Sequence, residues 1–546
     1  MPTRSLWMRF GTLVVALAVF AACGTETPVT VREHLPPFVA ALRPDQPGFN
    51  ESFRFDVGDT VESYDSVGGG FRLHYARTGR NAVSATDVDV SGVPDFVEDA
   101  ATIYDGVLSF YRDALGFLPP LSDDSITDNG GDGRFDVYLV DFGGGGADGV
   151  FRTDASLVSN PDQCIGYMVQ ENDFVGYGYP STHIATQILA SHELFHAVQA
   201  AYDANQGAVL SEGTATWATE QYDSSLRDFE SAVRGYFDNP DHPLDVPMAG
   251  PVDAFSYGTA IYFEFLSERF DPTMVRSLWE RVVNDANGEA DPNWFAVLPG
   301  VLNDAGADSF AETWVQFATW NLYTGAFADP TQSYARGADY PRVRVDVVAA
   351  PWQDAALRVS HAATEYYSLA PEGRSDMTAA LVGPVEELLD LHLVLAVGLG
   401  SSYDPVLVVS DITAGTETVP TASARNLVVA VVNASTGTMS RHPGICVGTV
   451  DEVAACRNEL VPTQAGPTES TNGQGGCDCA ASISIPAALI CMLMMLRRRK
   501  PGAARMTVSL VCSIDRVAQL AASSSHRHRK NASLGEALLQ QRHKRR

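Results

Sequence analysis

The stretch that most restricts how this chain folds is residues 182–203, which contains the run "SHELFHAVQ". Its apolar residues recur at the spacing of an amphipathic helix; they are Ile184, Ile188, Leu189, Phe195 and Val198. Residues four apart lie on one face of a helix, so His192 and His196 present their rings on the same side. The fold must therefore bury one face of this helix and keep both imidazoles near its edge.

The order of residues around these histidines predicts a metal site. Two imidazoles at this spacing can bind one ion. Zinc accepts such nitrogen ligands, and three protein ligands leave a fourth position for water. Glu193 follows His192 and can reach that water without binding the metal, as the base that takes its proton. The alternative is a surface helix whose histidines are incidental.

The stretch "LSEGTATWATEQ" begins 14 residues after His196, the distance of a turn and a second antiparallel helix. With this second motif the region resembles a zincin metallopeptidase of the gluzincin type. It is similar to a secreted metalloprotease family of myxobacteria and related bacteria, in which Glu-x-x-Ala-x-Trp follows the His-Glu-x-x-His helix. Glu212, Ala215 and Trp217 match that motif. The resemblance implies Glu212 as the third zinc ligand, with Glu220, two turns later, as its rival.

Neighbouring positions refine the resemblance. Gln199 and Tyr202 stand where a metzincin needs Gly and His, so that group of zincins is excluded. Thr216 occupies the position where gluzincins often carry an aspartate that orients a histidine, so the sequence names no orienting partner. The developing oxyanion also needs a donor. Tyr257, just before a predicted helix, and His242, on a nearby loop, are the candidates, and a structural role is the alternative for each.

A second ion site is predicted at "DVDVSGVPDFVE". Its residues fill positions 1, 3, 5, 6, 9 and 12 of a loop of the EF-hand type; they are Asp87, Asp89, Ser91, Gly92, Asp95 and Glu98. No helical pattern precedes them, so the stretch resembles an isolated calcium loop that enters a helix. The alternative is an Asp-rich turn with helix capping. A weaker candidate is "TDNGGDGRFD", with Asp128, Asp132 and Asp136.

The fold class predicted for the body is α+β. Residues 71–338 are expected to form a mainly helical, zincin-like domain, after an extended lead-in at 24–70. Helical patterns lie at 96–117, 182–203, 210–222, 256–270 and 309–325, and one strand is expected at 133–143. From residue 339 to 460 short β-type runs alternate with turn residues, which predicts an antiparallel β-sandwich domain.

The N-terminal segment reads as a targeting sequence. In residues 1–23, Arg4 and Arg9 flank an apolar run that ends in small residues before Cys23. This resembles a bacterial lipoprotein signal, which implies cleavage and lipidation at Cys23.

The C-terminal segment predicts a membrane anchor. A polar linker, 461–476, leads into residues 477–500, where Cys-x-Cys is followed by an apolar run and four basic residues. The arrangement resembles the sorting tails of myxobacterial surface proteins. The basic residues 501–546 are expected to be a disordered extension.

Charge and cysteine content restrict the remaining possibilities. The net charge of −30 divides unevenly, because residues 497–546 hold 13 Lys and Arg against two acids and residues 1–496 carry about −41. So acidic a body argues against nucleic-acid binding. Cys446 and Cys456 are close enough in sequence to form a disulfide in an oxidising compartment. Cys164 is then the one cysteine of the body without a disulfide partner.

The sequence as a whole predicts an exported zinc metallopeptidase held at the cell surface, or secreted after tail processing, with protein or peptide substrates. Zinc is its expected cofactor and calcium a second candidate ion. Its membrane contacts are the C-terminal tail and an N-terminal lipid. The rival is a non-catalytic surface protein that uses the β-sandwich for adhesion and a degenerate zincin as scaffold.

Overall fold

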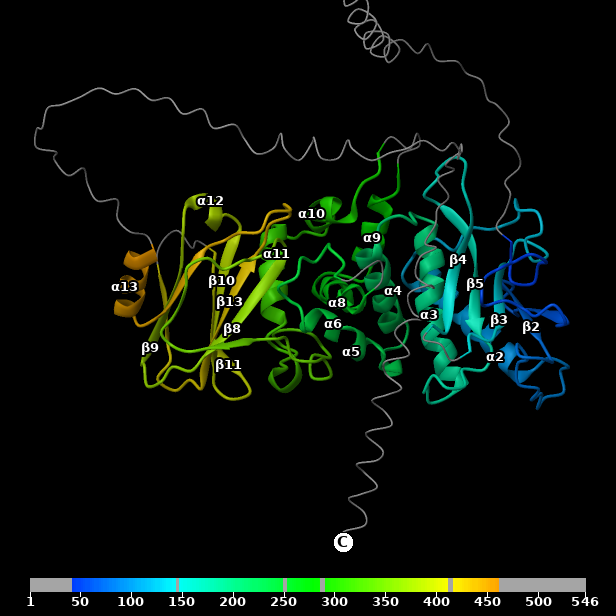
Figure 1. The fold of residues 1–546 in the computed structure, drawn as a ribbon, viewed down its shortest axis with the longest axis horizontal. Coiled ribbons are helices and arrows are strands. Elements are labelled where there is room, and N and C mark those ends of the chain that lie inside the picture. The colour runs from blue at the N-terminus through cyan, green and yellow to red at the C-terminus, as the bar shows by residue number, and fades with distance from the viewer. Residues whose placement is uncertain (1–41, 144–146, 249–252, 285–289, 411–415, 461–546) are drawn as a thin grey trace, which may run out of the picture.

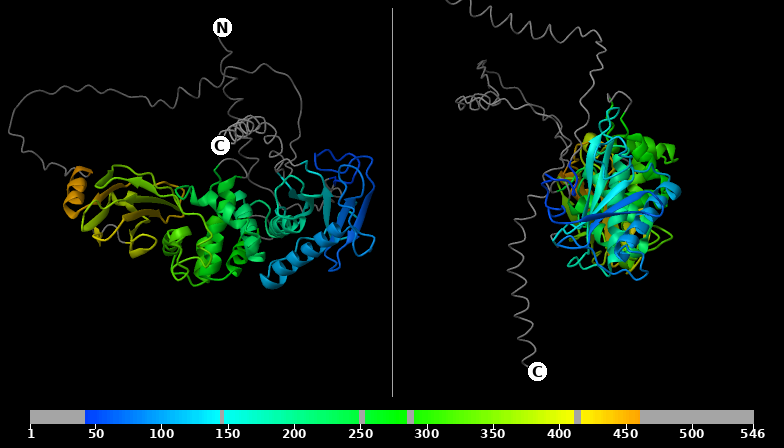
Figure 2. Two further views of the ribbon diagram at one scale, coloured as in Figure 1. Left: turned by 90° about the horizontal axis from the view of Figure 1, so that it is seen from below. Right: turned by 90° about the vertical axis from the view of Figure 1, so that its right-hand side faces the viewer.

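The computed structural model describes residues 42–143, 147–248, 253–284, 290–410 and 416–460. The predicted signal with Cys23, the linker 461–476, the tail 477–500 and the extension 501–546 lie outside these ranges. Helices and sheets are both present, so the α+β class is confirmed. The molecule is elongated, with one sheet at one end, helices in the middle and two sheets at the other end (Figure 1, Figure 2). No helix within the described ranges is long and apolar enough to cross a membrane.

Five strands form the first sheet, called sheet A. They are β1 (Val61–Asp65), β2 (Phe71–Ala76), β3 (Phe135–Val140), β4 (Gly149–Ser156) and β5 (Cys164–Glu171). Their order is β1-β2-β3-β5-β4, with β2, β3 and β5 parallel and the two outer strands antiparallel to their neighbours. β4 is therefore an edge strand of sheet A.

Both faces of sheet A are covered. One face packs against α2 (Asp95–Ser109), its continuation η1 (Phe110–Ala114) and α3 (Thr182–Ala200). The other face packs against the segment that begins at residue 42, where Phe55 joins Tyr138 and Tyr167 in an apolar cluster. Because alternate strand residues point to opposite faces, two covered faces produce strands with few exposed positions.

Arg43 fastens the segment before β1 to sheet A. Its side chain is 1% exposed. The guanidinium pairs with Asp123 at 2.7 Å, Asp136 at 2.6 Å and Asp154 at 2.7 Å. Breaking these buried ion pairs would strongly destabilise the fold, because removal of one partner leaves an uncompensated buried charge. The part of the predicted lead-in from residue 42 onward thus belongs to the folded body.

The central layer is helical. Its helices are α4 (Ala208–Tyr222), η2 (Ser224–Leu226), α5 (Phe229–Ala232), α6 (Arg234–Phe237), α7 (Ala254–Gly258), α8 (Ala260–Arg269), α9 (Thr273–Arg281), α10 (Trp294–Asp304), α11 (Phe310–Trp320) and η3 (Gly325–Phe327). Aromatic side chains fill its core, among them Trp217, Trp279 and Trp314 at 1% exposure or less. All five predicted helical stretches are confirmed, while α5, α6, α9 and α10 were not predicted.

Two further sheets face each other across an apolar layer. Sheet B, in the order β11-β10-β13-β8-β6, consists of β6 (Asp346–Val348), β8 (Ala363–Leu369), β10 (Leu391–Gly398), β11 (Tyr403–Val409) and β13 (Asn426–Asn433). Sheet C, in the order β12-β9-β14-β7, consists of β7 (Trp352–Asp354), β9 (Asp376–Val382), β12 (Glu417–Pro420) and β14 (Gly444–Gly448). A short helix, α12 (Val385–Leu388), connects β9 and β10.

Sheet B has a second buried face, which packs on the helices (Figure 1). Along β13, Val429 and Val431 point to sheet C, whereas Val428, Ala430 and Val432 belong to the helical core. The run "NLVVAVVN" lacks alternation because both of its faces are covered. The helical layer and sheet B therefore share one hydrophobic core.

Two sequence expectations differ from the structure. One strand was expected between residues 71 and 338, but this range contains β2, β3, β4 and β5. The boundary placed at 70/71 also falls between β1 and β2, which pair as an antiparallel hairpin. β3 lies within the predicted strand, whereas β2 and β5 were missed because a strand buried on both faces has no period of two for a pattern search to find.

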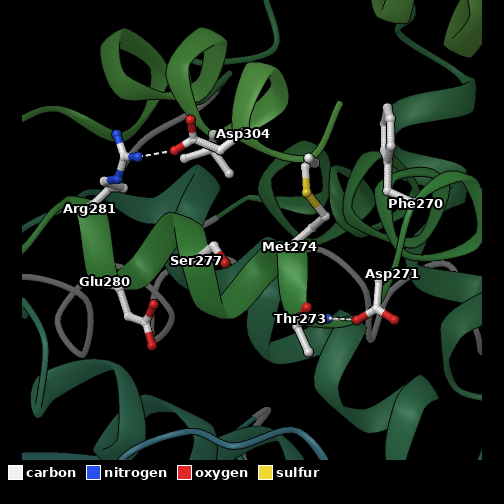
Figure 3. Close-up of a pocket in the computed structure, with 10 residues that line it drawn as sticks. Phe270, Asp271, Thr273, Met274, Ser277, Glu280, Arg281 and Asp304 are labelled. Atoms are coloured by element: carbon white, nitrogen blue, oxygen red, sulfur yellow. Dashed lines mark hydrogen bonds and ion pairs between the residues drawn. The ribbon is translucent and has the colours of Figure 1, made fainter. Parts of the chain in front are cut away.

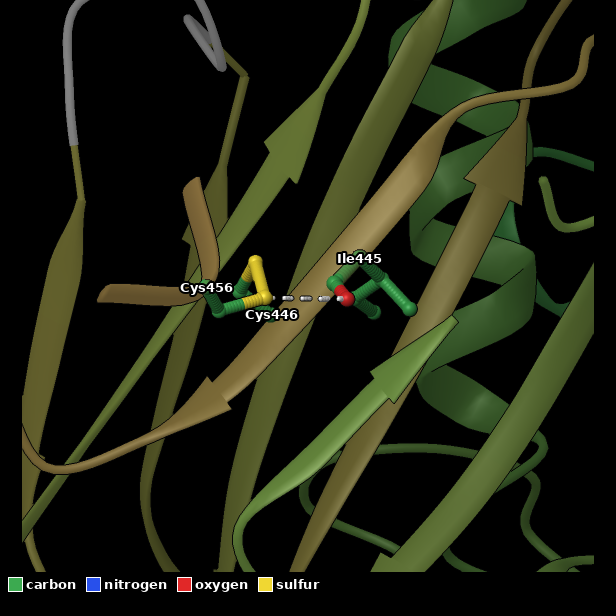
Figure 4. The surroundings of a disulfide bond; sticks show 3 residues. All are labelled: Ile445, Cys446 and Cys456. Carbon is green, nitrogen blue, oxygen red and sulfur yellow. Dashed lines mark hydrogen bonds between the residues drawn. A yellow bond between two sulfur atoms is a disulfide. The ribbon is translucent and has the colours of Figure 1, made fainter. Parts of the chain in front are cut away.

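The last described helix, α13 (Val450–Leu460), lies on the outer face of sheet C. The predicted Cys446–Cys456 disulfide is confirmed and joins β14 to this helix (Figure 4). Val453 and Leu460 add apolar contacts to the same cluster. Cys164 is buried in β5, with its Sγ 3.5 Å from the Ser156 hydroxyl.

We expect the double variant Cys446→Ala/Cys456→Ala to lower the free energy of unfolding by about 2–3 kcal/mol, because the bridge closes a loop of ten residues. Denaturant unfolding measures the loss. A reductant should reproduce it in the wild type and add nothing in the double variant. Equal unfolding midpoints for the oxidised wild type and the double variant would contradict the prediction.

Candidate metal centre

Helices α3 and α4 hold the predicted ligands, and local features set their positions. The Ser181 hydroxyl accepts the Ile184 N–H at 3.2 Å and begins α3. Gly207 begins α4 with a φ of 86°, a conformation that suits glycine. A side chain at Gly213 would clash with Thr259 and Phe263, so the glycine lets α4 approach α7 and α8 closely.

Hydrogen bonds between helices fix α3 beside its neighbours. The Tyr111 hydroxyl donates to the carbonyl of Ser191, the residue before His192. The Ser191 hydroxyl in turn lies 3.1 Å from Thr219 Oγ1 on α4. The middle turn of α3 is thereby held on two sides.

The three predicted zinc ligands meet at one point. Glu212 Oε2 lies 3.2 Å from His192 Nε2 and 3.5 Å from His196 Nε2. The two imidazole rings are 5.0 Å apart between centroids. All three side chains are mostly buried, at 12–14% exposure. Two imidazole nitrogens and one carboxylate are a donor set that zinc accepts, so these residues fit the ion.

Gln199 supplies the orienting partner that the sequence did not name. Its Oε1 lies 2.8 Å from His196 Nδ1, while its Nε2 donates to the Ser211 carbonyl at 2.7 Å and to Thr214 Oγ1 at 3.0 Å. Since Oε1 can only accept, His196 carries its proton on Nδ1. In the neutral form of His196 the unprotonated atom is then Nε2, which faces Glu212, and this is the tautomer that a metal ligand needs.

Burial and charge act against each other at this centre. Burial opposes the charged form of His196, but the carboxylates of Glu212 and Glu193 prevail and raise its pKa to about 9. Burial also opposes ionisation of Glu212, yet the two imidazoles hold its pKa well below its usual range. Without an ion, the charged form of His196 and the Glu212 carboxylate thus stabilise each other.

Glu193 lies beside the two histidine ligands and is held by a different part of the chain from Glu212. One carboxylate oxygen of Glu193 and one nitrogen from each of His192 and His196 lie within 4.8 Å of one another. Its Oε2 accepts the backbone N–H of Phe151 on β4 at 2.9 Å. The edge strand therefore holds the predicted base next to the ligands.

Of the two candidate oxyanion donors, Tyr257 is at the centre. Its ring stacks on His192 at 5.6 Å between centroids, with 18° between the planes. Burial, together with the carboxylates of Glu212 and Glu193, raises the pKa of its hydroxyl, which stays protonated as a donor. His242 is engaged elsewhere, with Nε2 2.8 Å from the Val246 carbonyl and its ring against Phe255.

The rival ligand Glu220 lies away from the histidines. Its carboxylate pairs with Arg336, which also pairs with Glu230. Burial raises the pKa of Glu220 to about 7 against the opposing effect of Arg336. The structure therefore brings Glu212, and not Glu220, to His192 and His196.

A cavity of about 540 Å³ lies elsewhere, between α9 and α10 (Figure 3). Phe270, Met274 and Val301 contribute apolar surface to it, and Arg281 pairs with Asp304 at its edge. None of its lining residues belongs to the candidate metal centre.

The predicted calcium loop brings part of its ligand set together. Carboxylate oxygens of Asp87, Asp89 and Asp95 lie within 4.8 Å of one another. Asp87 accepts the N–H groups of Ser91 and Gly92 at 3.0 Å, and Asp95 accepts that of Val88 at 3.0 Å.

The other two positions of this loop have different surroundings. The Ser91 hydroxyl is 3.3 Å from the Val93 carbonyl, and Glu98 lies in the first turn of α2. Hydrogen bonds from Asp and Ser side chains to nearby backbone groups are equally typical of the alternative, an Asp-rich turn that caps a helix. Calcium binding at this loop stays a prediction.

The weaker calcium candidate has its carboxylates committed to arginines. Asp132 pairs with Arg72 at 2.9 Å and also with Arg134. Asp136 pairs with Arg43 at 2.6 Å. Because these carboxylates already pair with arginines, they are poorly placed to bind one common calcium ion.

Sequence reasoning missed three groups at the metal centre, which are Gln199, Ser211 and the Phe151 N–H. Gln199 lies three residues after His196, so helical spacing alone could have identified it. Ser211, whose hydroxyl is 3.2 Å from His196 Nδ1, and Phe151 reach the site through tertiary packing.

Comparison with known proteins adds no assignment: no family model matches the chain, and a search of curated proteins returns no significant match.

Proposed function

We propose that this protein is a zinc-dependent metallopeptidase of the gluzincin type that hydrolyses peptide bonds. The observation that carries the proposal is the convergence of His192 Nε2, His196 Nε2 and Glu212 Oε2, with the Glu193 carboxylate alongside. A zinc ion held there would supply a Lewis acid that polarises the substrate carbonyl and lowers the pKa of the water, so that the water is easily deprotonated for attack.

The chain's own groups divide the remaining work. Glu193 accepts the proton of the attacking water and passes it to the leaving amine. Tyr257 donates a hydrogen bond to the developing oxyanion, because its hydroxyl stays protonated beside two carboxylates. Gln199 holds the His196 ring and its proton in place.

The position of β4 supports a peptide as substrate. β4 is an edge strand, and a strand at an edge offers backbone groups to an extended chain. Phe151 on this strand contacts Glu193 through its N–H. A peptide paired along β4 would carry its carbonyl groups past the predicted base.

The proposal includes an exported location. The signal at residues 1–23 with a lipid at Cys23 and the tail at 477–500 would attach the enzyme to a membrane or release it after processing. The body would then consist of a mainly helical zincin-like domain and a β-sandwich domain, with the Cys446–Cys456 bridge suited to an oxidising compartment.

We expect the purified protein to contain about one zinc ion per chain, consistent with a single three-ligand site. Glu212→Gln and His196→Ala should each lose it, because each removes one of three ligands. Glu220→Gln is the matched control, since it changes the same residue type on the same helix and should keep the zinc. Elemental analysis after dialysis measures the content.

The outcome also decides the rival function. A native protein without zinc, or zinc that survives both ligand variants, would contradict the proposal. The first result would favour the non-catalytic surface protein with a degenerate zincin scaffold.

A further inference from the structure

Two carboxyl groups, those of Glu264 and Glu268, lie on one face of α8, because residues four apart share a face of a helix. Both line a cavity of about 360 Å³, together with Glu220 and Gln221 on α4 and Arg336 on the segment after η3. Glu264 is buried, at 7% exposure, whereas Glu268 is exposed. We call Glu264 and Glu268 the α8 carboxyl pair.

Each member of the α8 carboxyl pair holds a different neighbouring segment. Glu264 Oε2 accepts from Gln221 Nε2 at 2.7 Å, and Glu268 Oε2 accepts the Ala335 N–H at 2.7 Å. The two carboxyl groups also hydrogen-bond to each other. Since an ionised carboxylate can only accept, this last contact requires a proton on one of the two groups.

Negative charge exceeds positive charge around the cavity. Among the described residues that line it, Arg336 is the one cation, and its guanidinium already pairs with Glu220 and Glu230. Neither Glu264 nor Glu268 pairs with a basic side chain in the described part of the chain. A buried carboxylate without a cation is unfavourable, so the fold favours a neutral Glu264.

Groups on the neighbouring elements do not remove this imbalance. The titratable and charged groups around the pair are Glu220 on α4, Arg227 after η2, Glu230 on α5, and Tyr334, Arg336, Asp339 and Tyr340 after η3. Only Arg227 and Arg336 among them are cationic. Burial, together with the Glu268 and Glu220 carboxylates, raises the pKa of Glu264 well above its usual range.

We propose that Glu264 carries a proton at neutral pH, donates a hydrogen bond to Glu268, and thereby makes the α8 carboxyl pair a pH-sensitive switch. With the proton in place, the pair joins α8 to α4 through Gln221 and to the segment after η3 through Ala335. Without the proton, two neighbouring carboxylates repel each other and Glu264 becomes a buried charge. A rise in pH should therefore loosen the contact between these three segments.

The direction of the pH effect follows from the proton that the folded chain retains. When folding raises the pKa of a carboxyl group, its contribution to stability is complete below the ordinary glutamate value of 4.5. That contribution is lost as the pH rises through the folded value. Glu220, whose pKa burial raises to about 7, acts in the same direction, so the pair has to be isolated by comparing variants at several pH values.

Such a switch would act on the support of the candidate metal centre. Glu220 and Gln221 lie on α4, the helix that also carries Glu212 two turns earlier. Only this consequence rests on the proposed peptidase function. The pH dependence of folding does not.

The test compares the Tm of full-length wild type and Glu264→Gln from about pH 5 to about pH 8. The amide has the shape of a protonated carboxyl group, so its oxygen can accept from Gln221 and its NH₂ group can donate to Glu268 at every pH. The two proteins should melt alike at the acidic end. At the alkaline end Glu264→Gln should melt about 3–5 °C above the wild type.

A second variant and a control accompany this comparison. Glu268→Gln should show a shallower pH dependence than the wild type, because its amide can donate to ionised Glu264 while its oxygen keeps the Ala335 N–H. Glu280→Gln should keep the wild-type profile, since Glu280 is 53% exposed on α9 and pairs with Arg276. Infrared spectra should also show a protonated carboxyl band in the wild type at neutral pH that is missing from Glu264→Gln.

Three results would overturn the proposal. One is a difference in Tm between wild type and Glu264→Gln that is the same at both ends of the pH range, which would mean a purely structural role. The others are the wild-type pH profile in both Glu264→Gln and Glu268→Gln, and a wild type without the carboxyl band. None of these readouts uses peptidase activity, so failure of the proposed function would leave a distinct result.

Discussion

Replacement of Glu193 by Gln is expected to lower kcat for peptide hydrolysis by roughly 10²–10⁴-fold while the zinc ion stays bound. The amide has the shape of the carboxylate, and its oxygen can still accept the Phe151 N–H that Glu193 Oε2 accepts at 2.9 Å. What it cannot do is take a proton from water. Casein or a peptide library reports the cleavage, and elemental analysis reports the zinc.

Asp99→Asn is the control for this experiment. Asp99 also contacts α3, through His183 at 2.9 Å, but both side chains are exposed and the pair lies far along the helix from Glu193. Its activity should match the wild type. If Glu193→Gln keeps full activity, another group activates water; if it loses zinc as well, Glu193 acts through the metal and not as a base.

The candidate centre divides into a part that sequence could predict and a part that it could not. His192, Glu193 and His196 follow from helical spacing, and Glu212 was carried over from the resemblance; the structure brings all four together. The contact between Glu193 and Phe151 joins residues 42 positions apart, and no local pattern encodes it.

The same distinction applies to the fold. Local helical patterns predicted α2, α3, α4, α8 and α11, because the residues that favour a helix lie within each segment. Apart from β3, which lies within the strand predicted at 133–143, sheet A was not predicted, because its pairing depends on partners far away in sequence. Arg43 illustrates this, since it reaches Asp154 on β4 across 111 positions.

The buried second face of sheet B leads to an expected failure to fold. A chain that ends at residue 338 should be insoluble or molten, whereas residues 42–460 should unfold in one cooperative transition. The shorter chain loses Val394, Val428 and Val432, which are at most 1% exposed and belong to the core of the helical layer. Burial of each valine is worth about 1.5–3 kcal/mol, and the whole stability of a domain is about 5–15 kcal/mol. Solubility and calorimetry compare the two chains.

A point variant tests the same shared core without truncation. Ala430 is 0% exposed on the face of β13 that meets the helices, and near it the Tyr366 hydroxyl of β8 donates to the Ala318 carbonyl of α11 at 2.7 Å. Ala430→Glu buries a charge without a partner there and should destabilise by several kcal/mol. Val408→Glu, on β11 at 43% exposure, is the control and should cost little. Two results would mean that the helical layer and sheet B fold independently. One is a chain ending at residue 338 that is soluble and unfolds cooperatively; the other is an equal loss of stability in Ala430→Glu and Val408→Glu. In that case the β-rich part would be free to act as a separate adhesion module.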